Sequence, residues 1–363
     1  MGTFNYNDTT LYNLRMLYEQ FGYKRFKMSK FEEYDLYLEY KKFLSTQNII
    51  TFTDLNGKLY ALKPDITISI AKNAKQGETQ KLYYKENVYR ASAETKEYKE
   101  ITQLGLEYVG DIDAYTLGEV VLLAARSLRS ISENYVLDIS HMGFVSALLD
   151  EAGLSDSRKE KLVTFLGKKD AHELRFSCEK YGVDSAVTER IVALCEIYGD
   201  FESTYEQIKA LATTPAMIDA VNELESLYSF LKATGEGAHI NLDFSIVNDM
   251  SYYNGVIFRG YIESVPCSVL SGGRYDNLLV KLGKNCQAMG FAVYVDMLEL
   301  YANHEKDYDV DVMLCYDNSV TPVQIAEKAA GYTSQGKSVK VMSYVPDGVK
   351  YKQLVKFSKE GEA

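Results

Sequence analysis

Two short polar segments contain residue types from which a site for a small cationic ligand could be built. Asp65 and Thr67 are two residues apart in a segment that we predict to be extended, and in a strand that spacing points both side chains to one face. Gln103 and Glu107 share one face of a second predicted strand, and Gly105 leaves room between them. A carboxylate and a carboxamide that face the same way suit an ammonium group. From spacing alone, a solvated sheet face explains the second segment equally well.

A third region combines paired tyrosines with a glycine-containing run. Tyr252 and Tyr253 precede Gly255, and Gly-Gly-Arg-Tyr-Asp follows at 272–276. Such patterns are common as turns and packing elements. The chain contains no P-loop, no G-x-S-x-G and no H-E-x-x-H motif, so its local signatures identify no catalytic device.

The histidines and cysteines are not spaced to hold a metal ion. The four histidines are isolated, and the five cysteines form no C-x-x-C pair. We therefore predict no metal site and no disulfide framework, and we expect the cysteines to be thiols in a reducing cytoplasm. Residues 1–6 contain no basic region that leads into an apolar stretch, which predicts no signal peptide and a cytoplasmic location.

Composition limits the class of protein and the partners that we expect. The chain has 363 residues, of which 46% are hydrophobic and 25% charged, as in globular proteins. The longest apolar runs, such as 120–125, are far shorter than the ~20 residues that cross a bilayer, so we predict no membrane segment. With 40 basic and 51 acidic residues, the net charge of −11 argues against nucleic acid as a partner.

Hydrophobic periodicity indicates the elements that must position these segments. The pattern predicts helices at 10–23 and 119–131, and strands at 59–62, 81–84, 101–109 and 135–139. It is wholly helical from about 141 to 234, and strands return at 240–246, 256–262 and 289–295. A small βαβ piece follows, with strands at 310–314 and 339–342 around a helix at 322–334. We therefore predict an α+β fold, with one largely antiparallel sheet interrupted by a helical insertion.

Taken together and in order, six segments resemble the catalytic core of histidyl-tRNA synthetases, which are class II synthetases. They are Leu62–Thr67, Val88–Arg90, Gln103–Glu107, Tyr252–Gly255, Gly272–Asp276 and Gly290–Ala292. The resemblance spans roughly residues 9–301 and implies a class II synthetase-like core over 1–302, with a helical insertion at about 141–235. The remaining residues, 307–363, then form a truncated C-terminal α/β domain. The resemblance also implies a homodimer of the core.

The chain departs from the family at positions that handle ATP. Ser92 stands where the family has a glutamate, and Asn248 and Met297 stand where it has arginines. Those arginines stabilise the charge that develops during adenylation, and the loss of one such donor typically costs ~10²–10³ in rate. The resemblance thus implies that no adenylation activity remains.

The ligand side of the family's site is kept. Six residues match family positions that hold histidine: Asp65, Thr67, Gln103, Glu107, Tyr252 and Tyr253. Arg90 matches a family arginine that could contact a phosphate-bearing ligand. The resemblance therefore implies an L-histidine site without catalytic residues, metal or cofactor.

A retained amino-acid pocket with dismantled ATP chemistry resembles the synthetase paralogues that serve as regulatory subunits of ATP phosphoribosyltransferase. This resemblance implies a non-catalytic activating subunit that binds L-histidine for feedback control of histidine biosynthesis. Its implied partner is a short-form catalytic subunit, in a hetero-oligomer. Two alternatives remain open: a histidyl-tRNA synthetase with divergent motifs, and a stand-alone amino-acid ligase that uses the same pocket.

Overall fold

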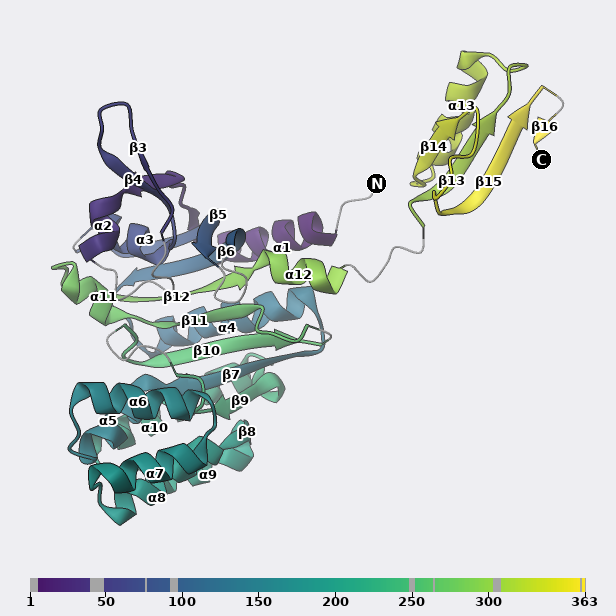
Figure 1. The fold of residues 1–363 in the computed structure, drawn as a ribbon. Coiled ribbons are helices and arrows are strands. Elements are labelled where there is room, and N and C mark those ends of the chain that lie inside the picture. The colour runs from purple at the N-terminus through teal and green to yellow at the C-terminus, as the bar shows by residue number, and fades with distance from the viewer. Residues whose placement is uncertain are drawn as a thin grey trace. The chain divides into compact units, whose positions relative to one another are not determined.

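The computed structural model describes residues 6–39, 49–75, 77–91, 97–247, 252–263, 265–302, 308–359 and 361–362. Contacts divide the chain into two compact units (Figure 1). One unit is Tyr12–Met297, and the other combines Met1–Leu11 with Leu298–Ala363. All of the candidate site residues lie in the first unit.

A nine-stranded sheet forms the centre of the unit 12–297. Its strands, in spatial order, are β1 (Lys24–Arg25), β5 (Gln80–Ala91), β6 (Tyr98–Gly110), β12 (Gln287–Tyr294), β11 (Leu270–Arg274), β10 (Val256–Ile262), β7 (Tyr135–His141), β9 (Ile240–Asp243) and β8 (Tyr198–Asp200). Neighbouring strands are antiparallel, except for the β1–β5 and β7–β9 pairs. The largely antiparallel sheet with its helices confirms the predicted α+β class.

One face of the sheet packs against α4 (Ala114–Ile131) and the second half of α1 (Tyr6–Gln20). Helix α4 begins where Asp113 accepts a hydrogen bond from the Thr116 backbone, and most of its residues are buried. The Tyr18 hydroxyl lies 2.9 Å from Ser127 Oγ, which joins the two helices. A Cβ added to Gly260 of β10 would lie 2.6 Å from Leu128, so the glycine lets α4 approach the sheet closely.

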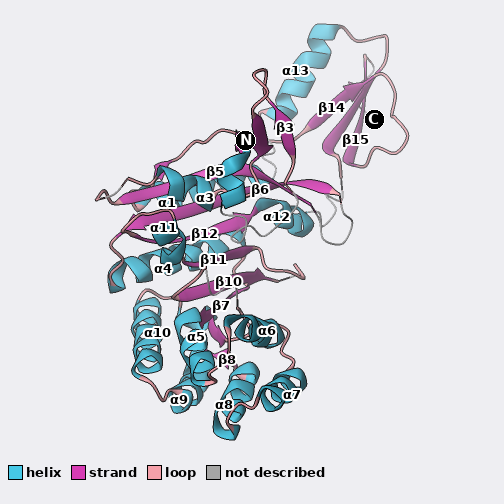
Figure 2. Ribbon diagram, turned by 60° about the vertical axis from the view of Figure 1, so that its left-hand side comes forward, coloured by secondary structure: helices cyan, strands magenta, loops and turns pink. Residues whose placement is uncertain are grey.

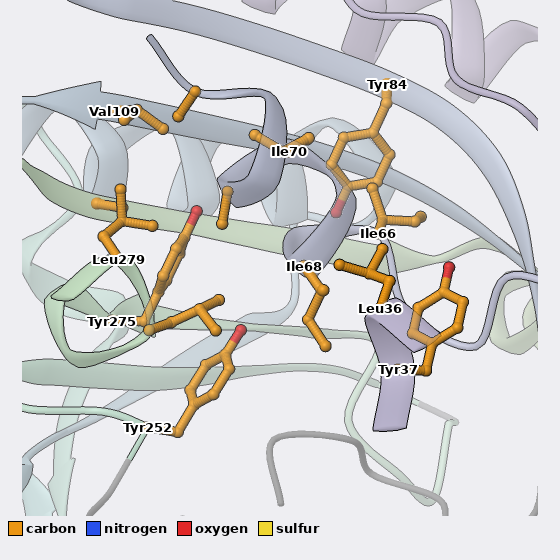
Figure 3. Close-up of a cluster of buried hydrophobic side chains, with 14 of the residues drawn as sticks. Leu36, Tyr37, Ile66, Ile68, Ile70, Tyr84, Val109, Tyr252, Tyr275 and Leu279 are labelled. Carbon is orange, nitrogen blue, oxygen red and sulfur yellow. The ribbon is translucent and has the colours of Figure 1, made fainter. Parts of the chain in front are cut away.

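The opposite face of the sheet holds the candidate site. It is covered by α3 (Thr67–Asn73), α11 (Asp276–Lys281) and α2 (Tyr34–Glu39), together with a three-stranded sheet of β2 (Phe31–Glu33), β4 (Leu59–Leu62) and β3 (Thr51–Thr53). A hydrophobic cluster joins Ile68 and Ile70 of α3, Leu279 of α11 and the rings of Tyr84 and Tyr252 (Figure 3).

Between β7 and β9 the chain forms a bundle of helices: α5 (Met142–Glu151), α6 (Asp156–Gly167), α7 (Ala171–Tyr181), α8 (Ser185–Glu196), α9 (Phe201–Leu211) and α10 (Pro215–Ala233), then the short 3₁₀-helix η2 (Gly237–His239). Figure 2 shows these helices gathered at the β7–β8 end of the sheet. Thr214 caps α10 and Pro215 occupies its first turn, as predicted. The prediction of a wholly helical segment is wrong at β8, which pairs with β9.

The C-terminal part of the other unit contains α12 (Val295–Ala302), which begins at the end of the first unit, and a second sheet. This sheet has the order β14 (Val339–Met342), β13 (Val310–Tyr316), β15 (Tyr351–Ser358) and β16 (Gly361–Glu362), with α13 (Pro322–Thr333) between β13 and β14. The parallel β13–β14 pair confirms the predicted βαβ piece. Strand β15, which was not predicted, adds a second parallel pair.

The described parts of the chain show neither a membrane-spanning helix nor a cluster of metal-ligating side chains. None of the helices there is long and apolar enough to cross a membrane. Those parts also contain no group of three or more His, Cys, Asp or Glu side chains placed to hold a metal ion.

Candidate functional site

Glu107 lies at the centre of the candidate site, in the middle of β6, and its side chain is buried. Strand pairing places Gly290 of β12 directly opposite. A Cβ added to Gly290 would lie only 1.8 Å from Glu107 Oε2. The glycine therefore provides the space that the Glu107 carboxyl group occupies.

Hydroxyl groups from two directions hold the Glu107 carboxyl group. The Tyr275 hydroxyl donates to Oε2 at 2.5 Å, and Thr67 Oγ1 donates to Oε1 at 3.2 Å. Burial raises the pKa of Glu107 to about 8; the Tyr275 bond opposes this shift, and the nearby charge of Asp65 adds to it. The carboxyl group is thus largely protonated near neutral pH, and a cation placed beside it would favour its ionised form.

Gln103 and Gly105 lie on the same face of β6 as Glu107, as predicted. Gln103 is buried, and its pairing partner on β12 is Tyr294. The space above Gly105 is not left for a ligand, because a Cβ there would lie 2.2 Å from the Tyr84 hydroxyl. Tyr84 fills the position that we assigned to the ligand.

The prediction that Asp65 and Thr67 point to one face of a strand is wrong. Strand β4 ends at Leu62, and Thr67 is the first residue of α3. Asp65 Oδ1 accepts a hydrogen bond from the backbone N–H of Ile68 at 3.1 Å, which satisfies one free donor of the helix start. Thr67 still contacts Glu107, but it does so from the first turn of α3 and not from the face of a strand.

Arg90 orients the segment that carries Asp65. Its Nε donates to the Pro64 carbonyl at 2.8 Å, and its Nη2 lies 3.4 Å from Asp65 Oδ2. The guanidinium and the carboxylate are both about four-fifths buried. Arg90 therefore acts on the site at least partly through Asp65.

The paired tyrosines lie beside Tyr275, whose hydroxyl holds the Glu107 carboxyl group. The rings of Tyr252 and Tyr253 are 4.5 Å apart at 60°, and Tyr252 lies 5.8 Å from Tyr275. Figure 3 shows Tyr252 and Tyr275 as neighbours beside Ile68. Burial raises the pKa of the Tyr252 hydroxyl well above its ordinary value, so this hydroxyl is neutral. Its hydrogen-bond partner is Thr67.

Six of the seven predicted site residues thus make direct contacts in two groups: Asp65 with Arg90, and Thr67 with Glu107, Tyr252 and, through Tyr252, Tyr253. Gln103 lies on the same face of β6 as Glu107. Sequence reasoning missed Tyr84, Tyr275 and Gly290 as parts of the site. Tyr275 and Gly290 belong to segments that carry the family resemblance, and that was the available signal.

Asp296 and Met297 follow β12, where the chain departs from the synthetase pattern. Their contacts differ from those of an arginine that binds phosphate. Met297 Sδ lies 3.5 Å from Cys267 Sγ, and Asp296 Oδ2 accepts a hydrogen bond from the Thr102 backbone at 3.0 Å. The thioether has no charge to offer a phosphate. Ser92 and Asn248, the other two departures, lie outside the described residues.

Comparison with known proteins places this geometry in a family. A family model described as histidyl-tRNA synthetase matches residues 3–298. The ATP phosphoribosyltransferase regulatory subunit of Clostridium kluyveri is 30% identical over 322 residues, which cover 84% of this chain and 81% of that protein.

Solved structures give the same result. A structure described as an ATP phosphoribosyltransferase regulatory subunit/histidyl-tRNA synthetase from Bacillus halodurans is 26% identical, with a TM-score of 0.77 over 96% of this chain and 93% of that one. A chain of the ATP phosphoribosyl transferase (HisG:HisZ) complex from Thermotoga maritima shares the fold, with 20% identity and a TM-score of 0.61 over 80% of this chain and 97% of that one. These similarities confirm the predicted class II synthetase-like fold.

Proposed function

Because the chain belongs to the histidyl-tRNA synthetase-like family of ATP phosphoribosyltransferase regulatory subunits, we propose that it binds L-histidine around Glu107 and thereby controls a separate catalytic subunit. Glu107 carries the proposal, because a buried carboxyl group that two hydroxyl groups hold in place is ready to receive a cationic ligand. Asp65, paired with Arg90, lies in the segment that leads into α3, and Tyr84, Tyr252 and Tyr275 supply the aromatic side of the proposed site.

The ammonium or imidazole group of histidine would make a charge-assisted hydrogen bond to Glu107. Loss of one partner of such a buried pair costs ~2–5 kcal/mol, because the other charge is left unpaired. We therefore expect Glu107→Gln to weaken histidine binding in calorimetry by more than about tenfold. Glu189→Gln, which changes an exposed glutamate on α8, should bind histidine like the wild type. Equal histidine affinity in wild type and Glu107→Gln would show that histidine does not bind at Glu107.

The proposed role is regulatory rather than catalytic. Its support is the Met297 thioether, packed against Cys267 where the family has an arginine. We expect no histidine-dependent ATP–pyrophosphate exchange above background. A clear exchange rate would instead favour the second candidate, a divergent histidyl-tRNA synthetase.

The proposed partner is a short-form ATP phosphoribosyltransferase catalytic subunit, and the Thermotoga maritima complex, whose title names both components, supports it by analogy of fold. We also propose that the core forms a homodimer. An aromatic patch on the small sheet, made of the exposed Phe31 and Phe52 and the half-buried Tyr60, supports a protein contact of this kind. A cytoplasmic location is supported by the five free cysteines.

A further inference from the structure

A pocket of about 220 Å³ lies on the same face of the sheet as Glu107. Strand pairing aligns Glu107 with Gly290, Gly273 and Ile257 across β12, β11 and β10, which lie side by side in Figure 1. Arg259 is two residues beyond Ile257, so it projects from the same face as Glu107. Arg259 lines the pocket together with Tyr253, Ser268, Ser271 and Tyr294.

The pocket is rich in hydroxyl groups. Ser271 pairs with Arg259 across β10 and β11, and its Oγ lies 2.6 Å from the Tyr294 hydroxyl. Ser268 adds a third hydroxyl to the lining. In the Ser271–Tyr294 bond one hydroxyl donates its only proton to the other, so Ser268 and one member of this pair are able to donate to an acceptor placed in the pocket.

The guanidinium group of Arg259 is half-buried. Among the described residues, no acidic side chain forms an ion pair with it, and its hydrogen-bond neighbour is the Tyr261 hydroxyl. Asp138, the cross-strand neighbour on β7, is engaged elsewhere: its Oδ1 accepts from Asn241 at 3.1 Å, and its charged neighbours are Asp243 and Lys169. A partly desolvated cation without a counter-charge favours the entry of an anion.

We propose that this pocket is a subsite for an anionic group, a carboxylate or a phosphate, with Arg259 as the cation and with Ser268 and the hydrogen-bonded pair of Ser271 and Tyr294 as the source of hydroxyl donors. Arginine suits this task because its planar fork of N–H groups matches the oxygens of both anions.

Two sources of the anion fit this chemistry. Tyr253 lines the pocket and its hydroxyl lies within the electrostatic influence of both Glu107 and Arg259. The first source is therefore the carboxylate of the amino acid whose cationic end is at Glu107. This possibility depends on the proposed histidine-binding function. The second source is a separate molecule that carries a phosphate or a carboxylate. This possibility is independent of the proposed histidine-binding function.

Calorimetry with three probes on wild type and Arg259→Gln tests the subsite. L-Histidine has the carboxylate, histidinol has the same ring and amine without it, and inorganic phosphate is a free anion. We expect Arg259→Gln to weaken the binding of histidine by about tenfold or more while histidinol binds equally to both proteins. If only phosphate binding is lost, the subsite holds a separate anion.

The subsite is contradicted if Arg259→Gln changes neither histidine nor phosphate binding, or if it weakens histidine and histidinol equally without affecting phosphate. Arg175→Gln, which removes an exposed arginine on α7, is the matched control. Ser271→Ala provides a second variant should Arg259→Gln fail to fold, and it should weaken the same probe. If the wild type binds phosphate through Arg259 but binds neither histidine nor histidinol, the proposed function fails and the subsite remains.

Discussion

At the scale of single residues, the site depends on space that side chains leave for one another. Glu107 fits between strands only because Gly290 has no side chain, and Tyr84 fills the space above Gly105. The family resemblance located Glu107, but nothing in the spacing of the sequence showed that a tyrosine occupies the gap beside it. The side chain that occupies the space beside a glycine can be identified only when the pairing register of the strands is known.

Gly290→Ala tests this dependence. We expect the added methyl group to displace the Glu107 carboxyl group, to lower the free energy of unfolding by ~1–3 kcal/mol and to abolish histidine binding. Gly331→Ala in α13 is the control, because a Cβ there meets nothing within 4 Å. Urea unfolding and calorimetry on both variants give the comparison, and a Gly290→Ala protein that behaves like Gly331→Ala would disprove the close contact.

The buried Glu107 predicts a pH dependence of stability. Folding raises the pKa of Glu107 from its ordinary value to about 8, so its contribution to stability is complete below that ordinary value and is lost as the pH rises through about 8. Wild type should therefore lose stability relative to Glu107→Gln between about pH 5 and pH 8, by up to ~1.4 kcal/mol per pH unit. Urea unfolding at several pH values measures this difference. Parallel pH profiles for the two proteins would mean that Glu107 is ionised in the folded state.

At the scale of elements, periodicity predicted the long helices and strands well, because one buried face sets their pattern. It failed where local chemistry overrides the pattern. The predicted strand at 240–246 ends at Asp243, whose carboxylate accepts from the backbone and hydroxyl of Ser245 and turns the chain. The Gly272–Gly273 pair suggested a turn but lies in β11, where a Cβ at either position would clash with neighbouring strands.

The helical bundle is fastened to the site-bearing sheet by a polar contact. Glu223 of α10 lies 2.7 Å from His141 Nε2 at the end of β7, and 3.8 Å from Arg274 Nη1 of β11. Burial raises the pKa of Glu223, but His141 and Arg274 outweigh this effect and lower it overall. Its contribution to stability is therefore present above the ordinary carboxyl pKa and is lost as the pH falls through the lowered value.

We expect Glu223→Gln to lower the free energy of unfolding at neutral pH by ~1–3 kcal/mol, because it leaves partly buried polar groups with a weaker partner. Asp219→Asn changes an exposed carboxylate on the same helix and should have little effect. Chemical denaturation of both variants provides the test, and an equal, small effect would show that apolar packing alone fastens the bundle.

At the scale of the whole molecule, the proposed regulatory role requires a protein partner, because ligand binding to this chain must change the activity of a separate catalytic subunit. Regulation by histidine requires that histidine bind one state of the complex better than another. A differential of ~1–3 kcal/mol changes the coupled equilibrium about 5- to 150-fold.

The aromatic patch of Phe31, Phe52 and Tyr60 is the proposed contact of the homodimer. We expect light scattering to give about twice the chain mass for wild type, and Phe52→Lys to shift the protein toward the monomer, because a charge would have to be buried in the contact. Phe176→Lys changes an exposed aromatic residue on α7 and should leave the mass unchanged. A wild-type monomer, or a dimer unaffected by Phe52→Lys, would show that this patch is not the dimer contact.

The most direct measurement is the activity of a short-form ATP phosphoribosyltransferase, titrated with histidine in the presence of this chain. The account predicts that wild type and Glu107→Gln both raise the activity of the catalytic subunit. Histidine should lower the activity of the wild-type complex at concentrations that leave the Glu107→Gln complex active. A catalytic subunit that is fully active and equally sensitive to histidine without this chain, and that never co-elutes with it, would contradict the account.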